Sequence, residues 1–447
     1  MRQADRQHED DAGGEASGGD GVRMEAHEPS AKYLAGAQFQ VSEVGLIPLD
    51  WEVIALATRA AIQSGIAKNT NATLRDPISV PYLRVANVQD GYLDLGEVST
   101  IDIERTDLRR YAVLPGDVLM NEGGDLDKLG RGAIWNGQIR SCVHQNHVFV
   151  VRCGQGLIPE YLNAWTSSAQ ARRYFVLAGR QTTNLASINK TSLGELTVAV
   201  PPTEREQHEI AAALTDADAL IDSLEQLLTK KRQIKQGAMQ ELLTGKRRLP
   251  GCDKPWVNRL FDGIAATSQE RVNPSALISP PLCLELEQLE SGTGCLSGSA
   301  FESQQAATKS VFRRGDVLFG KLRAYLRKYW LAEFDGVCST EIWVLRPNGD
   351  LASSKYLFYT VQRDEFIEAA STAYGTHMPR SDWKIVSEFA VRIPHDPAEQ
   401  EAIAVVLADM DTDLTALESR LTKARALKQA MAQALLTGRI RLVKPTT

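Results

Sequence analysis

Apolar residues recur along two long segments of the chain with the same spacing. Both series advance in alternating steps of four and three, the spacing of a coiled-coil seam. The first series is Ile210, Leu214, Ala217, Ile221, Leu224 and Leu228, and the second is Ile403, Leu407, Met410, Leu414, Leu417 and Leu421. Prolines precede both segments and glycines (Gly245 and Gly438) follow them. The pattern predicts two helices of about 40 residues, each roughly 60 Å long.

These helices belong to an internal repeat. Residues 201–249 align without a gap on residues 394–442, and 23 of the 49 positions are identical. Shorter matches extend upstream, where Val148–Arg152 corresponds to Ile342–Arg346. The chain therefore contains two copies of one unit. Each copy has a globular part whose sequence differs between the copies, followed by a helix whose sequence is similar in both. We interpret it as a pseudo-dimer within one chain.

Charge is distributed along both helices in the same direction. Residues 204–225 carry seven acidic side chains and one basic, whereas residues 230–248 carry seven basic and one acidic. The second copy repeats this, with seven acidic residues over 396–418 and only basic residues from 420 to 444. Two such helices attract when they are antiparallel and repel when they are parallel. The alternative is that these are ordinary solvated helix faces.

The globular parts mix short strand-like runs with a few helices, so the predicted class is α+β or mixed α/β. We expect strand, turn, strand over 113–120 and 311–319, and helices over 161–176 and 355–369. Four further strands are predicted, namely Val148–Val151, Ile342–Leu345, Val198–Val200 and Ala390–Ile393.

Composition excludes several classes of protein. The chain has 447 residues and a net charge of −6, of which −5 falls within residues 1–30. That glycine-rich, acidic start lacks the apolar core of a signal peptide, and we expect disorder over residues 1–34. No apolar stretch is long enough to span a membrane. Six cysteines without a Cys-x-x-Cys pair argue against a disulfide scaffold or a structural zinc site and favour a cytoplasmic protein.

Polar and basic residues in the globular parts form candidate nucleic-acid contacts. Arg, Asn and Gln can bind base edges, and interleaved Tyr and Arg suit phosphates and base stacking. In the first part the candidates are Arg131, Gln145, Asn146, His147, Arg180, Gln181, Thr182 and Asn184. In the second they are a basic hairpin of Lys321, Arg323, Tyr325, Arg327 and Lys328, together with Thr376, His377 and Arg380. The alternatives are a charged edge strand and ordinary polar turns.

Catalytic motifs are not found in the sequence. There is no phosphate-binding Gly-x-x-x-x-Gly-Lys-Ser/Thr loop, no dinucleotide fingerprint and no metal-spaced histidine pair. The string Ser279-Pro280-Pro281-Leu282 lacks the polar and aromatic residues of an amino-methyltransferase loop. We therefore expect a non-catalytic chain.

The helix-end motifs resemble those of a known family. Pro201-Pro202-Thr203-Glu204-Arg205-Glu206-Gln207, a long helix and then Leu242-Leu243-Thr244-Gly245 are similar to the specificity subunits of type I restriction-modification systems. The second copy keeps Glu399-Gln400 but has His395 in place of Pro202. The resemblance covers about residues 35–445. It implies two pseudo-symmetric target-recognition domains (35–200 and 250–393), separated by two long antiparallel coiled-coil helices (201–249 and 394–447).

The resemblance also implies a function. Each recognition domain would read one half of a split, asymmetric DNA site, and the helices would set the spacing between the halves. The helices would also dock two adenine methyltransferase subunits that carry S-adenosylmethionine and flip the target base. Restriction subunits would bring ATP and Mg, and this chain itself would hold no cofactor or metal. The expected partner-binding residues are Glu206, Gln207, Ile210, Leu214, Leu242, Leu243, Glu399, Gln400, Ile403, Leu407, Leu435 and Leu436.

Two alternatives remain open from the sequence. The chain could target a modification-only methyltransferase complex that has no restriction partner. It could also be a coiled-coil scaffold without a role on DNA.

Overall fold

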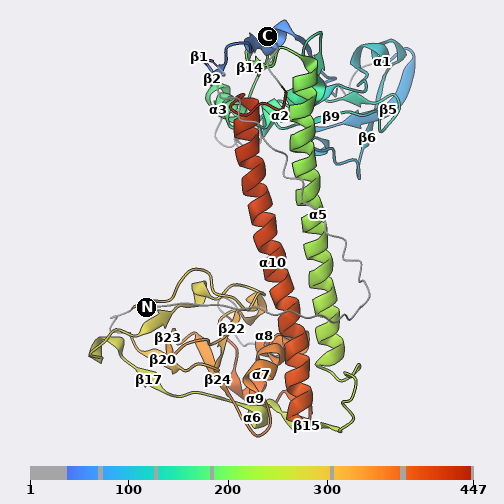
Figure 1. Cartoon of the computed structure of the whole chain (residues 1–447). Helices are drawn as coiled ribbons and strands as arrows, with labels where there is room; N and C mark the ends of the chain where they lie inside the picture. Colours follow the sequence, from blue (N-terminus) through green and yellow to red (C-terminus); the bar gives the residue numbers. More distant parts are fainter. Residues whose placement is uncertain are drawn as a thin grey trace, which may run out of the picture. The chain divides into compact units, whose positions relative to one another are not determined.

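The computed structural model describes residues 38–68, 74–124, 129–181, 186–302, 307–372 and 379–443. The expected acidic tail over residues 1–34 lies outside these ranges. The chain divides into two compact units, shown with their elements in Figure 1. Unit 1 comprises Met1–Leu214 and Met431–Thr447, and unit 2 comprises Thr215–Ala430. The two long helices of the sequence pattern are present as α5 (Glu204–Leu242) and α10 (Pro397–Leu436).

Unit 1 is built on two main sheets. A four-stranded antiparallel sheet has the order β4 (Ala60–Ser64), β11 (Val148–Cys153), β7 (Val118–Asn121) and β9 (Gly132–Ile134). A second sheet joins β10 (Val143–His144), β5 (Pro77–Leu83) and β6 (Ser99–Glu104). The helices are α1 (Arg105–Tyr111), α2 (Pro159–Thr166), α3 (Ala169–Ala178) and α4 (Lys190–Gly194). Large side chains such as Phe149, Tyr161 and Trp165 fill the core.

Unit 2 repeats the order of the four-stranded sheet. Its strands are β16 (Ala265–Thr267), β24 (Ile342–Pro347), β21 (Val317–Gly320) and β22 (Tyr329–Leu331). A five-stranded sheet joins β17 (Arg271–Val272), β20 (Lys309–Phe312), β23 (Gly336–Cys338), β18 (Leu282–Leu284) and β19 (Phe301–Glu302). Its shorter helices are α6 (Phe261–Ile264), α7 (Ser354–Thr360), α8 (Asp364–Ser371) and α9 (Trp383–Ser387). The mixed helix and strand class is confirmed, and the repeat extends to the topology of the sheets.

The strand before each long helix is anchored by its partner strand. β14 (Thr197–Val200) pairs with β3 (Glu52–Ala55), and β25 (Ala390–Pro394) pairs with β15 (Trp256–Leu260). Three small strands, β8 (Gly123–Gly124), β12 (Arg180–Gln181) and β13 (Ala186–Ser187), form a separate sheet. A hairpin of β1 (Phe39–Ser42) and β2 (Gly45–Pro48) completes the strands.

Some predicted elements are divided in the structure. The helix expected over 161–176 is broken into α2 and α3, because the Ser168 hydroxyl accepts a hydrogen bond from Ala171 N and caps a new helix. The helix expected over 355–369 is likewise two helices, α7 and α8. Over 113–120 the strand begins only at Val118, after a turn at Gly116 with a φ of 90°.

The predicted antiparallel seam between the long helices is confirmed. In unit 2, Leu224 and Leu228 of α5 pack against Leu417 and Leu421 of α10. Ion pairs give the direction: Asp218 pairs with Lys428, Glu225 with Arg425, and Lys231 with Asp413. Residue numbers therefore rise along α5 as they fall along α10. In unit 1, Ile210 and Leu214 share one core with Leu435 and Leu436.

Two further observations bear on the class of protein. All six cysteines are free thiols. In the part of the chain that the structure describes, no helix combines the length and the apolar character needed to cross a membrane.

Candidate nucleic-acid interface

Three chain segments meet at the end of β7 in unit 1 and at the end of β21 in unit 2. In unit 1, Glu122 N donates to His147 O at 2.9 Å, and Ile188 N donates to Glu122 O at 2.8 Å. In unit 2, Lys321 N donates to Glu341 O at 3.0 Å, and Ser381 N donates to Lys321 O at 2.8 Å. We call each of these arrangements a sheet-end junction. The two junctions have the same backbone connections.

The unit 1 junction gathers several of the predicted nucleic-acid contacts. Gln145, Asn146 and His147 form a tight turn before β11, closed by a 2.9 Å hydrogen bond from Val148 N to Gln145 O. His147 Nδ1 lies 2.7 Å from Glu122 Oε2, and its side chain is 56% exposed. Arg131, the residue before β9, lies near the junction because its carbonyl accepts a hydrogen bond from Asn121 N.

The remaining unit 1 candidates lie partly beyond the described residues. The backbone of Arg180 and Gln181 forms β12, which pairs with β13, and β13 pairs with β8 directly after Glu122. This places their backbone one strand from β8, and only their backbone is described. Thr182 and Asn184 lie outside the described residues.

The predicted basic hairpin of unit 2 is a loop that joins β21 to β22 and contains a short 3-10 helix (Ala324–Leu326). Arg323 and Arg327 flank this helix with φ values of 54° and 52°, which interrupt any strand. Within the loop, Ala324 is buried, while Arg323 and Tyr325 are exposed. The loop therefore presents two side chains suited to nucleic acid.

Arg327 and Lys328 support this loop from inside the unit. Arg327 Nη2 pairs with Asp364 Oδ1 on α8, and Lys328 Nζ donates to Leu286 O at 2.8 Å. The hydrogen bond from Arg327 lowers the pKa of Asp364 below its ordinary value. Gln236 of α5 donates to the other oxygen of Asp364 at 2.9 Å. The loop is thus tied to both α8 and α5.

Arg380 lies beside the same loop. Its Nε and Nη2 donate to the two carboxylate oxygens of Glu341 at 2.9 and 3.2 Å. Arg323 N donates to Pro379 O at 2.9 Å, so the loop and the 379–381 segment are held together. Thr376 and His377 lie outside the described residues. The structure therefore brings Lys321, Arg323 and Arg380 into one basic group.

The helix-end motifs form a second functional region inside each unit. Arg441 Nε and Nη2 donate to the two oxygens of Glu206 at 2.6 Å each. In unit 2, Arg248 makes the same two-pronged contact with Glu399 at 2.9 and 2.6 Å. We call these two contacts the helix clamps. Each joins the start of one long helix to the chain just beyond the end of the other.

The neighbouring glutamines attach each helix to its own domain. Gln207 Oε1 accepts from Ile158 N at 3.0 Å, and its Nε2 donates to Gly156 O at 3.0 Å. Gln400 Oε1 accepts from Ser353 N at 3.2 Å, and its Nε2 donates to Leu351 O at 2.7 Å. The glutamate of the motif thus attaches the helix start to the arginine that follows the other long helix, and the glutamine attaches it to the backbone of its own domain.

The motif side chains that were expected to bind a partner lie inside the chain. All twelve are buried within their own unit and belong to the clamps, the glutamine contacts and the cores there. They are Glu206, Gln207, Ile210, Leu214, Leu242, Leu243, Glu399, Gln400, Ile403, Leu407, Leu435 and Leu436.

The model of the type I restriction modification DNA specificity domain matches residues 48–236 and 298–424, which is most of the chain. The chain belongs to this family. The putative type I restriction enzyme MjaX specificity subunit of Methanocaldococcus jannaschii is 29% identical to this specificity-domain chain over 46% of it. The EcoDI specificity subunit of Escherichia coli is 28% identical over 44% of it. The matches cover 48% and 44% of those relatives, so the chain spans about half of their length.

Solved structures agree on the fold of the specificity-domain chain. The S subunit of the type I restriction-modification system from M. genitalium superposes with a TM-score of 0.54 at 12% identity. The superposition covers 89% of this chain and 97% of the M. genitalium chain. A chain from a structure of a type I R-M system complex gives the same TM-score at 16% identity, over 88% and 99% of the two chains.

Several residues of the specificity-domain chain were missed by sequence reasoning. Glu122, Glu341 and Asp364 each hold a predicted contact residue in place. The repeat contained a signal for the clamps, since Glu206 and Arg248 recur as Glu399 and Arg441. For Asp364 the sequence offered none, because its partner Arg327 is 37 positions away without a local pattern.

Proposed function

We propose that this chain is the non-catalytic DNA-specificity subunit of a type I restriction-modification complex. In this proposal each unit reads one half of a split, asymmetric site. The observation that carries it is the pair of sheet-end junctions, which have the same backbone connections but different exposed side chains. Two readers of the same build with different side chains suit two different half-sites. The names of the relatives, all specificity subunits, support the proposal.

The exposed and partly exposed side chains at the junctions have the chemistry of DNA contacts. Arg323 and Lys321 suit phosphates, Tyr325 can stack on a base or sugar, and Arg380 can donate to base edges. In unit 1, Gln145, Asn146 and His147 have the same capability. Arg131, Arg180, Gln181, Thr182, Asn184, Thr376 and His377 remain proposed contacts, whereas Arg327 and Lys328 are proposed to support the loop.

We propose further that α5 and α10 set the gap between the half-sites. Their register is fixed by ion pairs on the seam, including Asp218 with Lys428 and Lys235 with Asp411. Readers on one face of DNA require half-sites near a whole helical turn apart, about 34 Å. A helix of 39 residues, about 58 Å long, provides enough length for that purpose.

The proposed partners are two methyltransferase subunits with S-adenosylmethionine, which flip a target adenine, and restriction subunits with ATP and Mg. Since the motif side chains are buried, we propose that partners dock on exposed helix faces. Leu220, Leu227 and Ile234 of α5 are 49%, 40% and 48% exposed at seven-residue intervals, a spacing that a partner helix can match.

The test is genome-wide adenine methylation in the source cell with the gene intact and deleted. We expect that deletion of the gene abolishes adenine methylation at one split sequence motif with a fixed gap. Exchange of residues 35–200 for those of a relative should then change one half-site and leave the other unchanged. Change of both halves, or of neither, contradicts the assignment of the readers.

The two alternatives give different outcomes in the same cells. A modification-only complex shows methylation without restriction of unmodified DNA. A scaffold without a DNA role predicts that alanine at Lys321, Arg323 and Arg380 leaves DNA retention unchanged.

A further inference from the structure

The two sheet-end junctions differ in the order of their charges. In unit 1, the residue after β7 is acidic (Glu122) and the residue before β11 is His147. In unit 2, the corresponding positions are reversed, with Lys321 after β21 and the acidic Glu341 before β24. The backbone hydrogen bonds show that these positions are equivalent, since Glu122 N bonds His147 O as Lys321 N bonds Glu341 O.

The third segment of the junction also differs between the units. Ile188 N bonds Glu122 O as Ser381 N bonds Lys321 O, so residue 187 corresponds to residue 380. This position is Ser187 in unit 1 and Arg380 in unit 2. Unit 2 therefore has a guanidinium where unit 1 has only a hydroxyl. The junction is a fixed frame that carries a different set of hydrogen-bonding groups in each unit.

Glu341 holds the Arg380 guanidinium by one of its edges. Nε and Nη2 donate to the carboxylate, and both side chains are partly exposed, at 52% for Arg380 and 28% for Glu341. A guanidinium has five N–H donors in a rigid plane. Two of them serve Glu341, so the Nη1–Nη2 end keeps a pair of donors for one planar acceptor. A held guanidinium also loses less rotamer freedom on binding than a mobile one.

The planar acceptor in DNA that best fits such a fork is the O6–N7 edge of guanine in the major groove. A phosphate can also accept from arginine, but it does not require a fixed plane, and lysine can replace arginine there. Immobilisation by Glu341 is therefore more useful for reading a base than for neutralising the backbone.

We propose that the sheet-end junction is the specificity-determining site of each unit, and that Arg380, positioned by Glu341, reads a guanine in the half-site of unit 2. The inference rests on the proposed DNA-specificity function. In unit 1, Ser187 occupies the position of Arg380 beside the Glu122–His147 pair, so its half-site does not require guanine at the equivalent position. Glu341 is a positioning residue because it acts through Arg380.

The test uses the complete complex in the source cell and maps methylated adenines base by base. Arg380→Lys keeps the charge but loses the planar fork. It should reduce discrimination at one guanine of one half-site by roughly tenfold to hundredfold. The other half-site should stay as in the wild type. Glu341→Gln should relax the same position to a smaller extent, because a neutral amide holds the guanidinium less firmly.

The matched control is Arg314→Lys, the same substitution at an exposed arginine before the opposite end of β21, and it should leave the motif unchanged. An Arg380→Lys motif identical to the wild type at every position overturns the inference. Loss of all methylation in Arg380→Lys, with the control intact, also overturns it, because that result indicates general binding. If deletion of the wild-type gene removes no motif, the proposed function itself fails, and this outcome is distinct from both.

Discussion

Arg441 and Glu206 form a two-pronged ion pair in which both side chains are enclosed by the protein. The guanidinium is 4% exposed and the carboxylate 1% exposed, and Arg441 Nη1 also donates to Asp50 at 2.8 Å. Removal of one member of a buried pair leaves an uncompensated charge, whose cost is about 3–5 kcal/mol. The equivalent Arg248 is 29% exposed, so water can compensate part of a loss there.

The two helix clamps should therefore differ in sensitivity. Glu206→Gln should lower the free energy of unfolding by about 3 kcal/mol or more. Arg248→Met, which exposes Glu399 to partial hydration, should cost less, about 1–3 kcal/mol. Urea unfolding followed by circular dichroism measures both. The paired change of Glu206→Gln with Arg441→Met should recover part of the loss, and equal losses in all variants contradict the clamp.

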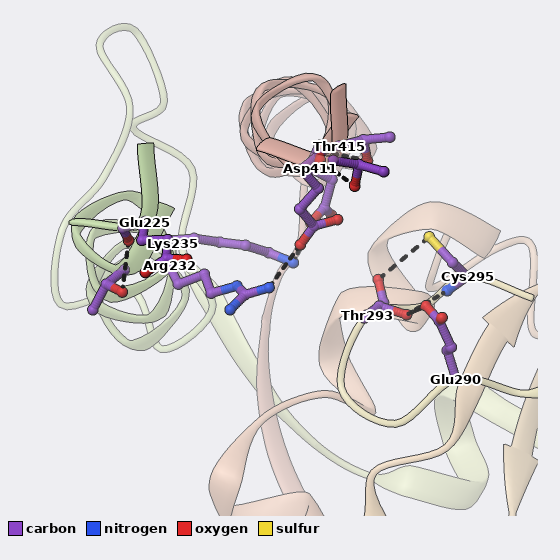
Figure 2. A network of polar contacts seen from close by, with 11 residues as sticks. Glu225, Arg232, Lys235, Glu290, Thr293, Cys295, Asp411 and Thr415 are labelled. Atoms are coloured by element: carbon purple, nitrogen blue, oxygen red, sulfur yellow. Dashed lines mark hydrogen bonds and ion pairs between the residues drawn. The ribbon is translucent and has the colours of Figure 1, made fainter. Parts of the chain in front are cut away.

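A second pair of ion pairs offers a comparison within unit 2. Lys235 reaches from α5 to Asp411 on α10, as Figure 2 shows, and its side chain is 9% exposed. Tyr359 Oη also donates to Asp411 at 2.9 Å. The repeat-related pair, Lys428 with Asp218, is 35% and 49% exposed.

Substitution of the buried lysine should therefore have the larger effect. Lys235→Ala should lower the free energy of unfolding by about 2–4 kcal/mol, because it leaves a carboxylate without its cation and removes a packed side chain. Lys428→Ala, the matched control at the repeat-related position, should cost at most about 1 kcal/mol. Thermal or urea unfolding distinguishes them, and a larger loss for Lys428→Ala contradicts the assignment.

The Arg327–Asp364 pair predicts a dependence of stability on pH. The hydrogen bond from Arg327 lowers the pKa of Asp364 below 3.8 in the folded protein. The unfolded chain therefore takes up this proton first as the pH falls, and stability is lost below about pH 4 down to the folded pKa. At neutral pH the stabilisation is fully present.

Asp364→Asn should remove this contribution. The slope of the unfolding free energy against pH should become shallower below about pH 4, while the contributions of the other carboxylates remain. Asp262→Asn, at an aspartate in the first turn of α6, is the control. If the wild type and Asp364→Asn have parallel pH profiles, the ion pair does not stabilise the fold.

The proposed role of α5 and α10 in spacing predicts the effect of insertions. Seven residues inserted in α5 near Lys231 alone shift the seam out of register and separate pairs such as Lys231 with Asp413, so the protein should be destabilised. Seven residues inserted also at the facing part of α10 restore the seam. They lengthen the pair of helices by about 10 Å, so the recognised gap should grow by about three base pairs. An unchanged gap in a folded double insertion contradicts the spacing role.

The sequence predicted the features that follow from regular spacing. The four-three periodicity placed Leu224 and Leu228 on the seam, and the charge order gave the antiparallel direction. Features that depend on distant partners could not be predicted. Arg327 was interpreted as a DNA contact because its neighbours are basic, and its ion pair with Asp364 of α8 had no local signal in the sequence.

Burial of charged motif residues was also invisible in the sequence. Glu206 and Glu399 occupy the first turns of their helices, and the family resemblance led to the expectation that they bind a partner. Each is instead enclosed by an arginine from the other repeat. Similarly, helix propensity over 161–176 continues through Ser167 and Ser168, and the break arises from a local cap.

The helix clamps have a consequence for the origin of the chain. Each repeat contains one clamp glutamate and one clamp arginine, but these lie in the first turn and beyond the end of the same long helix, which has 39 residues in the first repeat and 40 in the second. A protein with a single repeat could not join its own two groups, whereas two copies side by side would satisfy all four. The bonding pattern is that of an exchanged homodimer whose subunits have been fused by the peptide after α5. Each reader could then diverge after gene duplication, without any change in the two clamps.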